Sequence, residues 1–270
     1  MIDDQLRAHR LFLTDHLRKQ TDFSQTDQSR GLPPPPVQKP VPPDARRVSL
    51  PDSTQWQESI GQTSLVEAIA RRESRRRFAE EELTLAELSF LLWATQGVRR
   101  MLGHGNALRN VPSAGARHSF ETYLFIRNVS DLAPGLYRYL PLEHELVHLR
   151  NVPDMEAALT RAAYGQKFVG RSAVTFVWAC IPERMEWRYG LTAHRVILLD
   201  AGHVCQNLYL ACEAVAAGTC AVAAYDQAEM DQLLGVDGEE EFAVYVAPVG
   251  KRGVLPFLKK AKNISRYHGS

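Results

Sequence analysis

Arg71-Arg72-Glu73-Ser74-Arg75-Arg76-Arg77-Phe78 is the first of two segments on which the interpretation of this chain rests, and the second is Pro112-Ser113-Ala114-Gly115-Ala116-Arg117-His118. Guanidinium groups suit a phosphate dianion, because their planar donor forks form paired, charge-assisted hydrogen bonds. A loop of small residues lets a flat aromatic ring lie against the backbone. Together the two segments predict one site for a ligand that carries both groups.

Each segment also has a plainer interpretation when it is taken alone. The arginine run could be a solvated basic face or a weak nucleic-acid patch, and the small residues could mark tight packing. Arg72 and Arg76 are four apart, so they project to the same side if a helical turn persists through them. Ser74 would then add a hydroxyl donor between them.

The overall composition favours a globular enzyme without a polyanionic partner. The chain has 270 residues, of which 45% are hydrophobic, and its 32 basic residues nearly cancel its 31 acidic residues. No global field therefore draws it to nucleic acid or to an anionic membrane. It has no apolar run of about 18 residues, and its first residues lack the pattern of a secretory signal. We expect a cytoplasmic protein with neither nucleic acid nor membrane as a partner.

The cysteines and histidines indicate no metal centre. The cysteines form no CxxC pair and lie in apolar surroundings, which favours buried free thiols over disulfides. The histidines show no ligand spacing, so we expect no structural or catalytic metal. The four cysteines are Cys180, Cys205, Cys212 and Cys220.

The N-terminal region differs in composition from the rest of the chain. Residues 1–20 have helical spacing, and the tetraproline at 33–36 favours an extended polyproline II spacer, with an SH3-type ligand as the alternative. We therefore divide the chain into an N-terminal helix with a proline-rich linker, residues 1–45, and one compact domain, residues 46–270.

The pattern within residues 46–270 predicts an α+β fold with a mixed central sheet surrounded by helices. Capping boxes at Ser64 and Thr84 each begin a helix. Residues 101–110 are expected to form a loop, and the continuous apolar run 173–179 a central strand. Further strands are expected at 122–126, 136–139, 219–224 and 242–249, and further helices at 154–164, 192–217 and 227–234.

Six blocks in the expected order resemble the nitroreductase-like flavoproteins, and within them the SagB/ThcOx-type dehydrogenases. The arginine segment is similar to the family's RRSxRxF, the stretch 83–97 to LTLxELSxLLWAxxG, and the second segment to PSAGARH. Three later blocks complete the resemblance, which spans about residues 64–252: 200–210, 218–226 and 245–250.

The resemblance implies an FMN cofactor held at the interface of an intertwined homodimer. It implies that Arg72, Ser74 and Arg76 hold the phosphate, helped after the last strand by Gly250 and by Lys251 or Arg252. The small-residue loop would come from the partner subunit and lie along the flavin ring, with the backbone of Ala223 and Ala224 facing its N5 edge. The implied loop residues are Pro112, Ser113, Ala114, Gly115 and Ala116.

Two positions depart from the family's pattern. Many nitroreductases have an amide side chain where this chain has Ala116, so backbone donors would have to replace it. The Lys-Tyr pair of SagB-type azoline oxidases is matched by Arg188-Tyr189. Arginine stays protonated and cannot act as a base. Tyr189 therefore remains the one candidate for proton transfer, and a tyrosine packed at a loop edge is the alternative.

Five other residues are of a type that could serve a site. His203 and Gln206 are expected to be structural, and Trp178, like Trp93, to lie in the core. Trp187 is the aromatic residue expected near a substrate pocket.

The expected function is that of an FMN-dependent oxidoreductase of the SagB type, with hydride transfer through flavin N5 and a small-molecule or peptide substrate. One alternative is an NAD(P)H-dependent nitro or quinone reductase, in which NAD(P)H is a second partner. The other is a non-catalytic flavin-binding or assembly protein.

Overall fold

The computed structural model describes residues 2–56, 60–103 and 106–253. Its centre is a sheet of seven strands in the described part of the chain, and all neighbouring strands pair antiparallel. Parallel pairing occurs in isolated bridges, one of them between Ser74 and Thr219. The strand order across the sheet is β1 (Arg47–Ser49), β6 (Glu145–Arg150), β5 (Gly135–Leu140), β4 (Phe120–Ile126), β7 (Val174–Cys180), β9 (Phe242–Lys251) and β8 (Ala217–Thr219).

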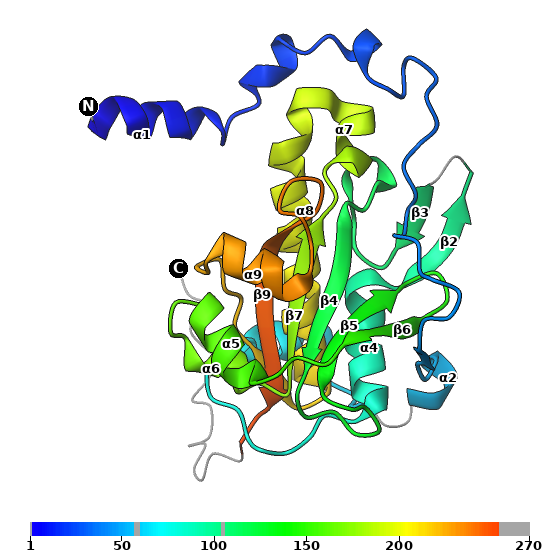
Figure 1. Cartoon of the computed structure of the whole chain (residues 1–270), viewed down its shortest axis with the longest axis vertical. Helices are drawn as coiled ribbons and strands as arrows, with labels where there is room; N and C mark the ends of the chain where they lie inside the picture. The colour runs from blue at the N-terminus through cyan, green and yellow to red at the C-terminus, as the bar shows by residue number, and fades with distance from the viewer. Residues whose placement is uncertain (1, 57–59, 104–105, 254–270) are drawn as a thin grey trace, which may run out of the picture.

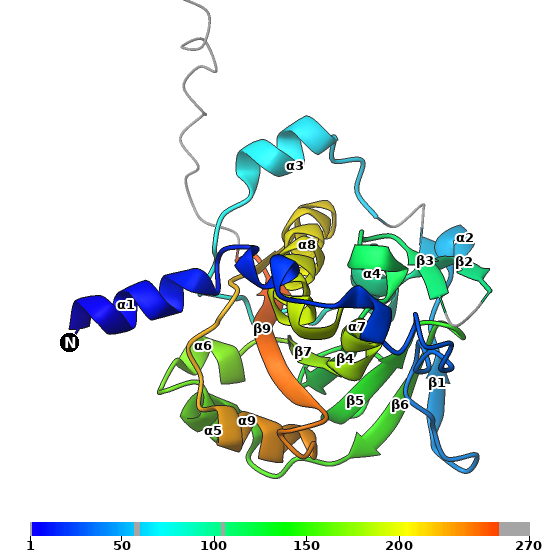
Figure 2. The same cartoon turned by 90° about the horizontal axis from the view of Figure 1, so that it is seen from above.

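Helices surround this sheet, which confirms the expected α+β class (Figures 1 and 2). Short 3-10 turns lie at η1 (His16–Lys19), η2 (Phe23–Gln25), η3 (Ala114–Ala116) and η4 (Gly190–Thr192). The α-helices are α1 (Ile2–Leu11), α2 (Ser53–Trp56), α3 (Leu65–Arg71), α4 (Leu85–Gln96), α5 (Met155–Ala162), α6 (Lys167–Gly170), α7 (Glu183–Tyr189), α8 (Ala193–Ala214) and α9 (Gln227–Leu234).

The central strands are buried on both faces. Every residue of β4 and β7 is buried, as the continuous apolar run of β7 predicted. Alternate side chains point to opposite faces of a strand. Leu124 and Phe176 therefore pack with α4 and α8, whereas Phe125 and Val177 pack with α5 and α9. The two hydrophobic clusters hold the sheet between two helical layers.

Both predicted capping boxes are present. The side chain of Ser64 accepts the amide hydrogen of Glu67 at the start of α3, and Thr84 does the same for Glu87 at the start of α4. In turn, the carboxylate of each glutamate accepts the backbone amide hydrogen of its cap residue. The helix starts were therefore predictable from three-residue patterns.

Three boundary predictions were wrong. The strand expected at 219–224 is β8 at Ala217–Thr219, and beyond it Val222 forms an isolated bridge to Val246. Residues 101–110 were expected to be a loop, but β2 (Val98–Leu102) and β3 (Asn106–Arg109) form a separate antiparallel pair. The middle of β2 is exposed, so it carries no apolar pattern. Helix α8 ends at Ala214 rather than at 217, since Ala216 takes a left-handed φ of 49° and the chain then enters β8.

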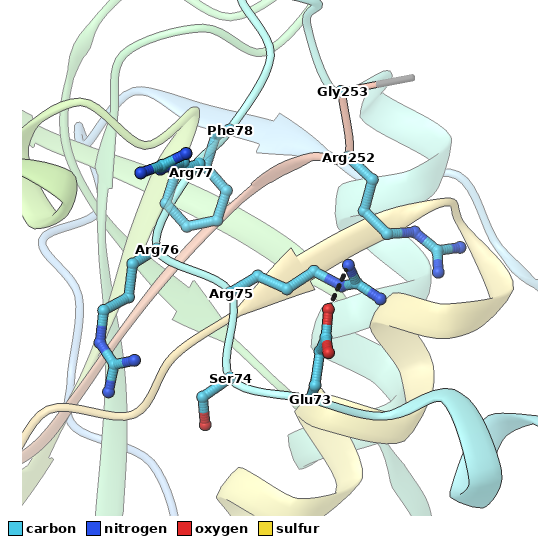
Figure 3. A pocket seen from close by; sticks show the side chains of 8 residues that line it. All are labelled: Glu73, Ser74, Arg75, Arg76, Arg77, Phe78, Arg252 and Gly253. Carbon is cyan, nitrogen blue, oxygen red and sulfur yellow. Dashed lines mark ion pairs between the residues drawn. The ribbon is translucent and has the colours of Figure 1, made fainter. Parts of the chain in front are cut away.

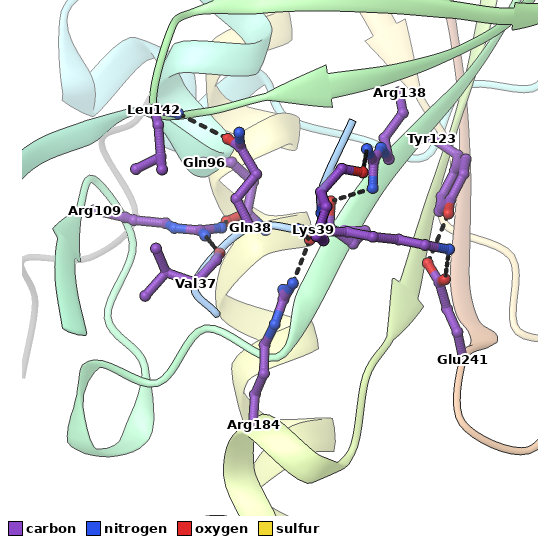
Figure 4. A network of polar contacts seen from close by, with 12 residues as sticks. Val37, Gln38, Lys39, Gln96, Arg109, Tyr123, Arg138, Leu142, Arg184 and Glu241 are labelled. Atoms are coloured by element: carbon purple, nitrogen blue, oxygen red, sulfur yellow. Dashed lines mark hydrogen bonds and ion pairs between the residues drawn. The ribbon is translucent and has the colours of Figure 1, made fainter. Parts of the chain in front are cut away.

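Residues 37–40 of the N-terminal region bond to the sheet, although α1 projects away from the body of the molecule (Figure 1). Buried Arg109 donates to the carbonyl of Val37 at 2.8 Å, and the amide of Lys39 donates to Glu121 at 2.8 Å (Figure 4). The division at residue 45 stays a prediction, and the end of the proposed domain, residues 254–270, lies outside the described residues. Across the described ranges, no helix is both long and apolar enough to span a membrane.

Candidate functional site

The arginine segment leaves its helix before it reaches the candidate site. Helix α3 ends at Arg71, and Arg72 has an extended ψ of 123°. The condition that a helical turn persists through Arg72 and Arg76 is therefore not met. The chain instead runs along the sheet edge, where the amide of Arg75 donates to the carbonyl of Thr219 at 2.9 Å and the amide of Ala79 donates to that of Lys251 at 2.9 Å.

Two glycines form the floor beneath this segment. Gly218 of β8 pairs with Gly250 of β9. A Cβ at Gly218 would lie 2.3 Å from Cδ of Arg75, and one at Gly250 would lie 2.7 Å from Cβ of Phe78. The arginine segment can approach the sheet this closely only because both positions lack a side chain.

A cavity of about 390 Å³ opens beside the segment. The side chains of Ser74 and Arg76 extend in one direction, whereas that of Arg75 extends toward Arg252 (Figure 3). Arg75 pairs with Glu73 at 2.7 Å, and Arg252 pairs with Glu213 at 2.7 Å. The cavity is lined by Glu73, Ser74, Arg75, Arg76, Arg77, Phe78, Arg252 and Gly253.

The basic residues at this site differ in whether a carboxylate group already pairs with them. Within the described part of the chain, Arg72 and Arg76 have no carboxylate partner, and each lies over an aromatic ring, at 5.4 Å from the centre of Tyr209 and 5.9 Å from that of Phe168. Lys251 is buried, and its ammonium group pairs with Glu87 and donates to the carbonyl of Val215. Arg72 and Arg76 are therefore available to an anion, whereas the charge of Lys251 is engaged.

The second segment forms the tight turn η3. Gly115 and Ala116 have left-handed φ values of 59° and 54°. The amide of Ala114 donates to the carboxylate of Asp200 at 3.2 Å, and the amide of His118 donates to Oγ of Ser113 at 2.9 Å. Burial raises the pKa of Asp200. These bonds hold Pro112, Ser113, Ala114, Gly115 and Ala116 in one compact loop.

Helix α8 connects the two halves of the site. Asp200 holds the small-residue loop, and Tyr209, nine residues further along the helix, hydrogen-bonds Oγ of Ser74 at 3.0 Å through its hydroxyl. At 1.5 Å per residue, these anchor points are roughly 13 Å apart along the helix. Both residues lie in the resembling block 200–210, but the sequence interpretation assigned them no role. Only the tertiary contacts show what they hold.

The hydroxyl of Tyr209 also accepts the amide hydrogen of Ala221 at 2.9 Å, at the start of the segment that leads to Ala223 and Ala224. Both alanines are exposed, and the carbonyl of Ala224 accepts a hydrogen bond from Gln166. The structure thus ties this segment to the arginine segment through one tyrosine.

Tyr189 lies against the small-residue loop. A Cβ at Gly115 would be 2.8 Å from the hydroxyl oxygen of Tyr189 and 2.9 Å from Cδ of Arg188. Trp187 is buried and donates to the carbonyl of Leu32, so the N-terminal region covers it. Its proximity to a substrate stays a prediction, as does the catalytic role of Tyr189.

Of the remaining candidate residues, one lies in the core and three are exposed. Trp178 is fully buried as expected, but Trp93 is 39% exposed. His203 and Gln206 face solvent on α8 rather than the interior. Outward orientation of one helical face explains this, since Gly202 beside them has no neighbour within 4 Å.

All four cysteines are buried free thiols. Burial raises the pKa of Cys180 and Cys205 to about 12, so both stay protonated near neutral pH. Among the residues that the structure describes, no cluster of three or more His, Cys, Asp or Glu could hold a metal ion.

The sequence profile of the Nitroreductase family matches residues 69–251, which include the sheet core, the arginine segment and the small-residue loop. The chain belongs to this family and is an oxidoreductase.

Two curated relatives are similar to it. A protein of Methanocaldococcus jannaschii, provisionally named a nitroreductase, is 31% identical over 209 residues, which cover 77% of this chain and 98% of that protein. The trifolitoxin-processing protein TfxB of Rhizobium leguminosarum bv. trifolii is 28% identical over 199 residues, which cover 69% of this chain and 48% of TfxB.

Two solved structures share the fold, and both are provisionally described as nitroreductases. The one from Anabaena variabilis ATCC 29413 superposes with a TM-score of 0.64 at 25% identity, covering 78% of this chain and 42% of that one. The one from Ralstonia eutropha JMP134 has a TM-score of 0.62 at 27% identity, and the match covers 83% of this chain and 100% of that one. The chain thus spans less than half of TfxB and of the Anabaena protein.

Proposed function

We propose that this protein is an FMN-dependent oxidoreductase whose arginine segment holds the cofactor phosphate. The observation that carries the proposal is the cavity beside a glycine floor, which Ser74 and the unpaired guanidinium group of Arg76 line, with the unpaired Arg72 two residues before Ser74 in the chain. A phosphomonoester is the ligand that such a donor set favours. FMN, when bound, supplies two-electron transfer at its N5 atom, and the protein supplies orientation and access.

The residues present fit a phosphate-bearing cofactor. Within the described residues, Nε of Arg75 and Oγ1 of Thr219 are buried without a hydrogen-bond partner, and the two residues are joined at the sheet edge by a backbone hydrogen bond. Buried polar groups are normally satisfied. An anion or its ordered water in the cavity would supply acceptors there. Arg252 and Gly250 would complete the site, with Lys251 supporting it through Glu87.

The ring-binding half of the proposal requires a homodimer. Large apolar side chains remain exposed on α3 and α8: Leu65, Val66, Ile69, Leu198 and Leu199, of which Val66 is 74% exposed. Such patches are typical of association surfaces. A second copy that covers them would bring its own small-residue loop, Pro112 to Ala116, toward the arginine segment, with Ala223 and Ala224 at the N5 edge.

For the reaction we propose SagB-type dehydrogenation first. TfxB, a trifolitoxin-processing protein by name, supports this class through its 28% identity over 199 residues. Tyr189 would then transfer a proton, because its hydroxyl lies beside Gly115. A cytoplasmic location belongs to the same proposal.

A second candidate is reduction of a nitro or quinone compound by NAD(P)H. The residue before Tyr189 is an arginine, which cannot accept a proton as a lysine can. The relative matched over 98% of its length is also provisionally named a nitroreductase. These two observations favour the reductase direction.

Anaerobic reduction of the purified, FMN-loaded protein separates the candidates. Bleaching of the yellow flavin by NAD(P)H supports the reductase, and bleaching by an azoline peptide but not by nicotinamides supports the dehydrogenase. A yellow protein that neither reagent bleaches would favour a non-catalytic flavin protein. Protein that takes up no FMN at micromolar concentrations would refute the proposal.

A further inference from the structure

A second cavity, of about 310 Å³, lies between the N-terminal region and the end of α7. The N-terminal region supplies most of its wall, and α7 supplies the rest. Its lining residues are Arg18, Phe23, Thr26, Gln28, Ser29, Arg188 and Tyr189. Its volume is at the lower end of the range for small-molecule sites, and it is too small for a folded partner.

Backbone contacts hold this wall in place. The amide of Gln28 donates to the carbonyl of Trp187 at 2.9 Å, and the indole of Trp187 donates to the carbonyl of Leu32 at 3.0 Å. Trp187 itself is 7% exposed. The wall is therefore a packed part of the fold, joined to α7 at Trp187.

The cavity carries positive charge without an acidic lining residue. Arg18 is paired with Asp15, at 2.5 Å between Nε and Oδ2. Arg188 has no carboxylate partner anywhere in the described part of the chain, and its guanidinium carbon lies 5.6 Å from the ring centre of Tyr189. Burial lowers the pKa of nearby Arg117, and Arg184 and Arg188 lower it further through repulsion. An anion beside Arg188 would relieve this repulsion.

Arg188 and Tyr189 also join this cavity to the small-residue loop. Cδ and Nε of Arg188 would each lie 2.9 Å from a Cβ at Gly115, and the Tyr189 hydroxyl would lie 2.8 Å from it. The two side chains thus have the loop on one side and the cavity on the other. A group bound in the cavity would extend toward whatever ring lies along the loop.

We propose that Arg188 is a specificity-determining residue that binds the carboxylate of a small organic substrate in this cavity. The identity of the neighbouring ring rests on the proposed function, but the anion site itself does not. The guanidinium fork matches a carboxylate in a bidentate manner. Phe23 and Tyr189 offer apolar faces to the carbon skeleton, and the exposed Ser29 offers a hydroxyl group.

The test uses two probes that differ only in charge, N-(4-nitrobenzoyl)glycine and its glycinamide. Binding to the full-length, FMN-loaded, oxidised protein is measured by calorimetry without nicotinamide, so that no turnover occurs. We expect the carboxylate to bind at least about tenfold more tightly than the amide. Arg188→Met should abolish the preference, and Arg188→Lys should restore part of it. Arg161→Met, which removes a remote surface arginine, should leave the preference unchanged.

Equal affinity of the two probes for the unaltered protein would overturn the proposal, as would a preference that survives Arg188→Met in a variant with an unchanged circular dichroism spectrum. The result separates this proposal from the proposed function. A carboxylate preference in protein that takes up no FMN would leave the anion site standing alone. Flavin reduction without a carboxylate preference would leave only the oxidoreductase proposal standing.

Discussion

Lys251 and Arg76 carry the same charge at the same edge of the sheet, but their neighbours assign them different roles. Lys251 is 8% exposed, and Glu87 holds its ammonium group inside the protein. Arg76 extends from an exposed segment without a carboxylate partner in the described residues. A basic residue that no carboxylate already holds is more readily available to a ligand anion, so Arg76 is a better phosphate ligand than Lys251.

Replacement of Arg76 by Ala tests this assignment. It removes one charge-assisted contact, worth about 1.5 to 3 kcal/mol, and so weakens FMN affinity by about tenfold or more. Quenching of FMN fluorescence on titration gives the affinity. Arg47→Met, in β1 at the opposite edge of the sheet, should bind FMN as the unaltered protein does. Unchanged affinity in Arg76→Ala would exclude Arg76 from the phosphate site.

Because His118 is buried, we expect the protein to lose stability in mild acid. Burial, followed by the nearby charge of Arg109, lowers its pKa to about 3 from an ordinary value of 6.5. Between these values the unfolded chain binds a proton that the folded chain does not. The free energy of unfolding therefore falls as pH decreases below 6.5, by up to about 1.4 kcal/mol per unit from this residue.

Urea denaturation of the protein and of His118→Asn, each at pH 7.5 and pH 5.5, measures this contribution. The variant should lose about 1 kcal/mol less than the unaltered protein between the two pH values. His144, whose pKa burial also lowers, is present in both proteins and cancels in the comparison. The same pH dependence in both would show that His118 becomes protonated in the folded state.

At the scale of elements, β8 and β9 position the candidate phosphate site because each has a glycine, without a side chain, beneath the arginine segment. The paired glycines Gly218 and Gly250 allow the arginine segment to lie directly on the sheet. The bridge from Ser74 to Thr219 then sets its register. The site is therefore sensitive to side-chain volume at both glycine positions.

Gly250→Ala should displace Phe78, because the new Cβ would lie 2.7 Å from its Cβ and Cγ. Overpacking of this kind costs about 1 to 3 kcal/mol of folding free energy. FMN affinity should decrease as well, since the segment carrying Ser74 and Arg76 must move. Gly103→Ala is the control, because a Cβ there meets nothing within 4 Å. Paired denaturation and FMN titrations check both effects, and full FMN affinity in Gly250→Ala would show that the floor does not position the site.

At the scale of the whole molecule, the segment after the tetraproline completes a network of buried charges (Figure 4). Glu121 pairs with Arg184 at 2.5 Å and accepts the amide hydrogen of Lys39. Glu241 accepts the hydroxyl hydrogen of Tyr123 at 2.7 Å and pairs with the ammonium group of Lys39. Burial lowers the pKa of Arg109 to about 10, and its bond to Val37 offsets part of that cost.

Truncation tests whether residues 1–45 are a dispensable linker. Removal of all 45 should destabilise the protein by several kcal/mol, since each buried polar group left without a partner costs about 1 to 3 kcal/mol. Removal of residues 1–13 alone takes away the projecting helix α1 and should leave the unfolding midpoint nearly unchanged. Equal midpoints for the two truncations, measured by urea denaturation, would support a linker that ends at residue 45.

The predictions that succeeded depend on short-range patterns. The capping boxes at Ser64 and Thr84 and helix α9 at 227–234 follow from residues within one or two turns of each other, and strand β7 follows from its own apolar run. The family motifs also assigned both halves of the candidate site, and that assignment stays a prediction. Each of these features depends on chemistry contained within a few consecutive residues.

Only the tertiary structure decided how those pieces meet. Whether Arg76 continues a helix depends on a bridge between Ser74 and Thr219, which lie far apart in the chain. The ion pair that occupies the charge of Lys251 depends on Glu87. The proximity of Arg188 to Gly115 depends on the packing of α7 against η3. The sequence determined the kinds of elements and the chemistry available to them, because backbone propensity and capping are local. Contacts between distant segments depend on how the whole core packs, and they decided which charges remain available to a ligand.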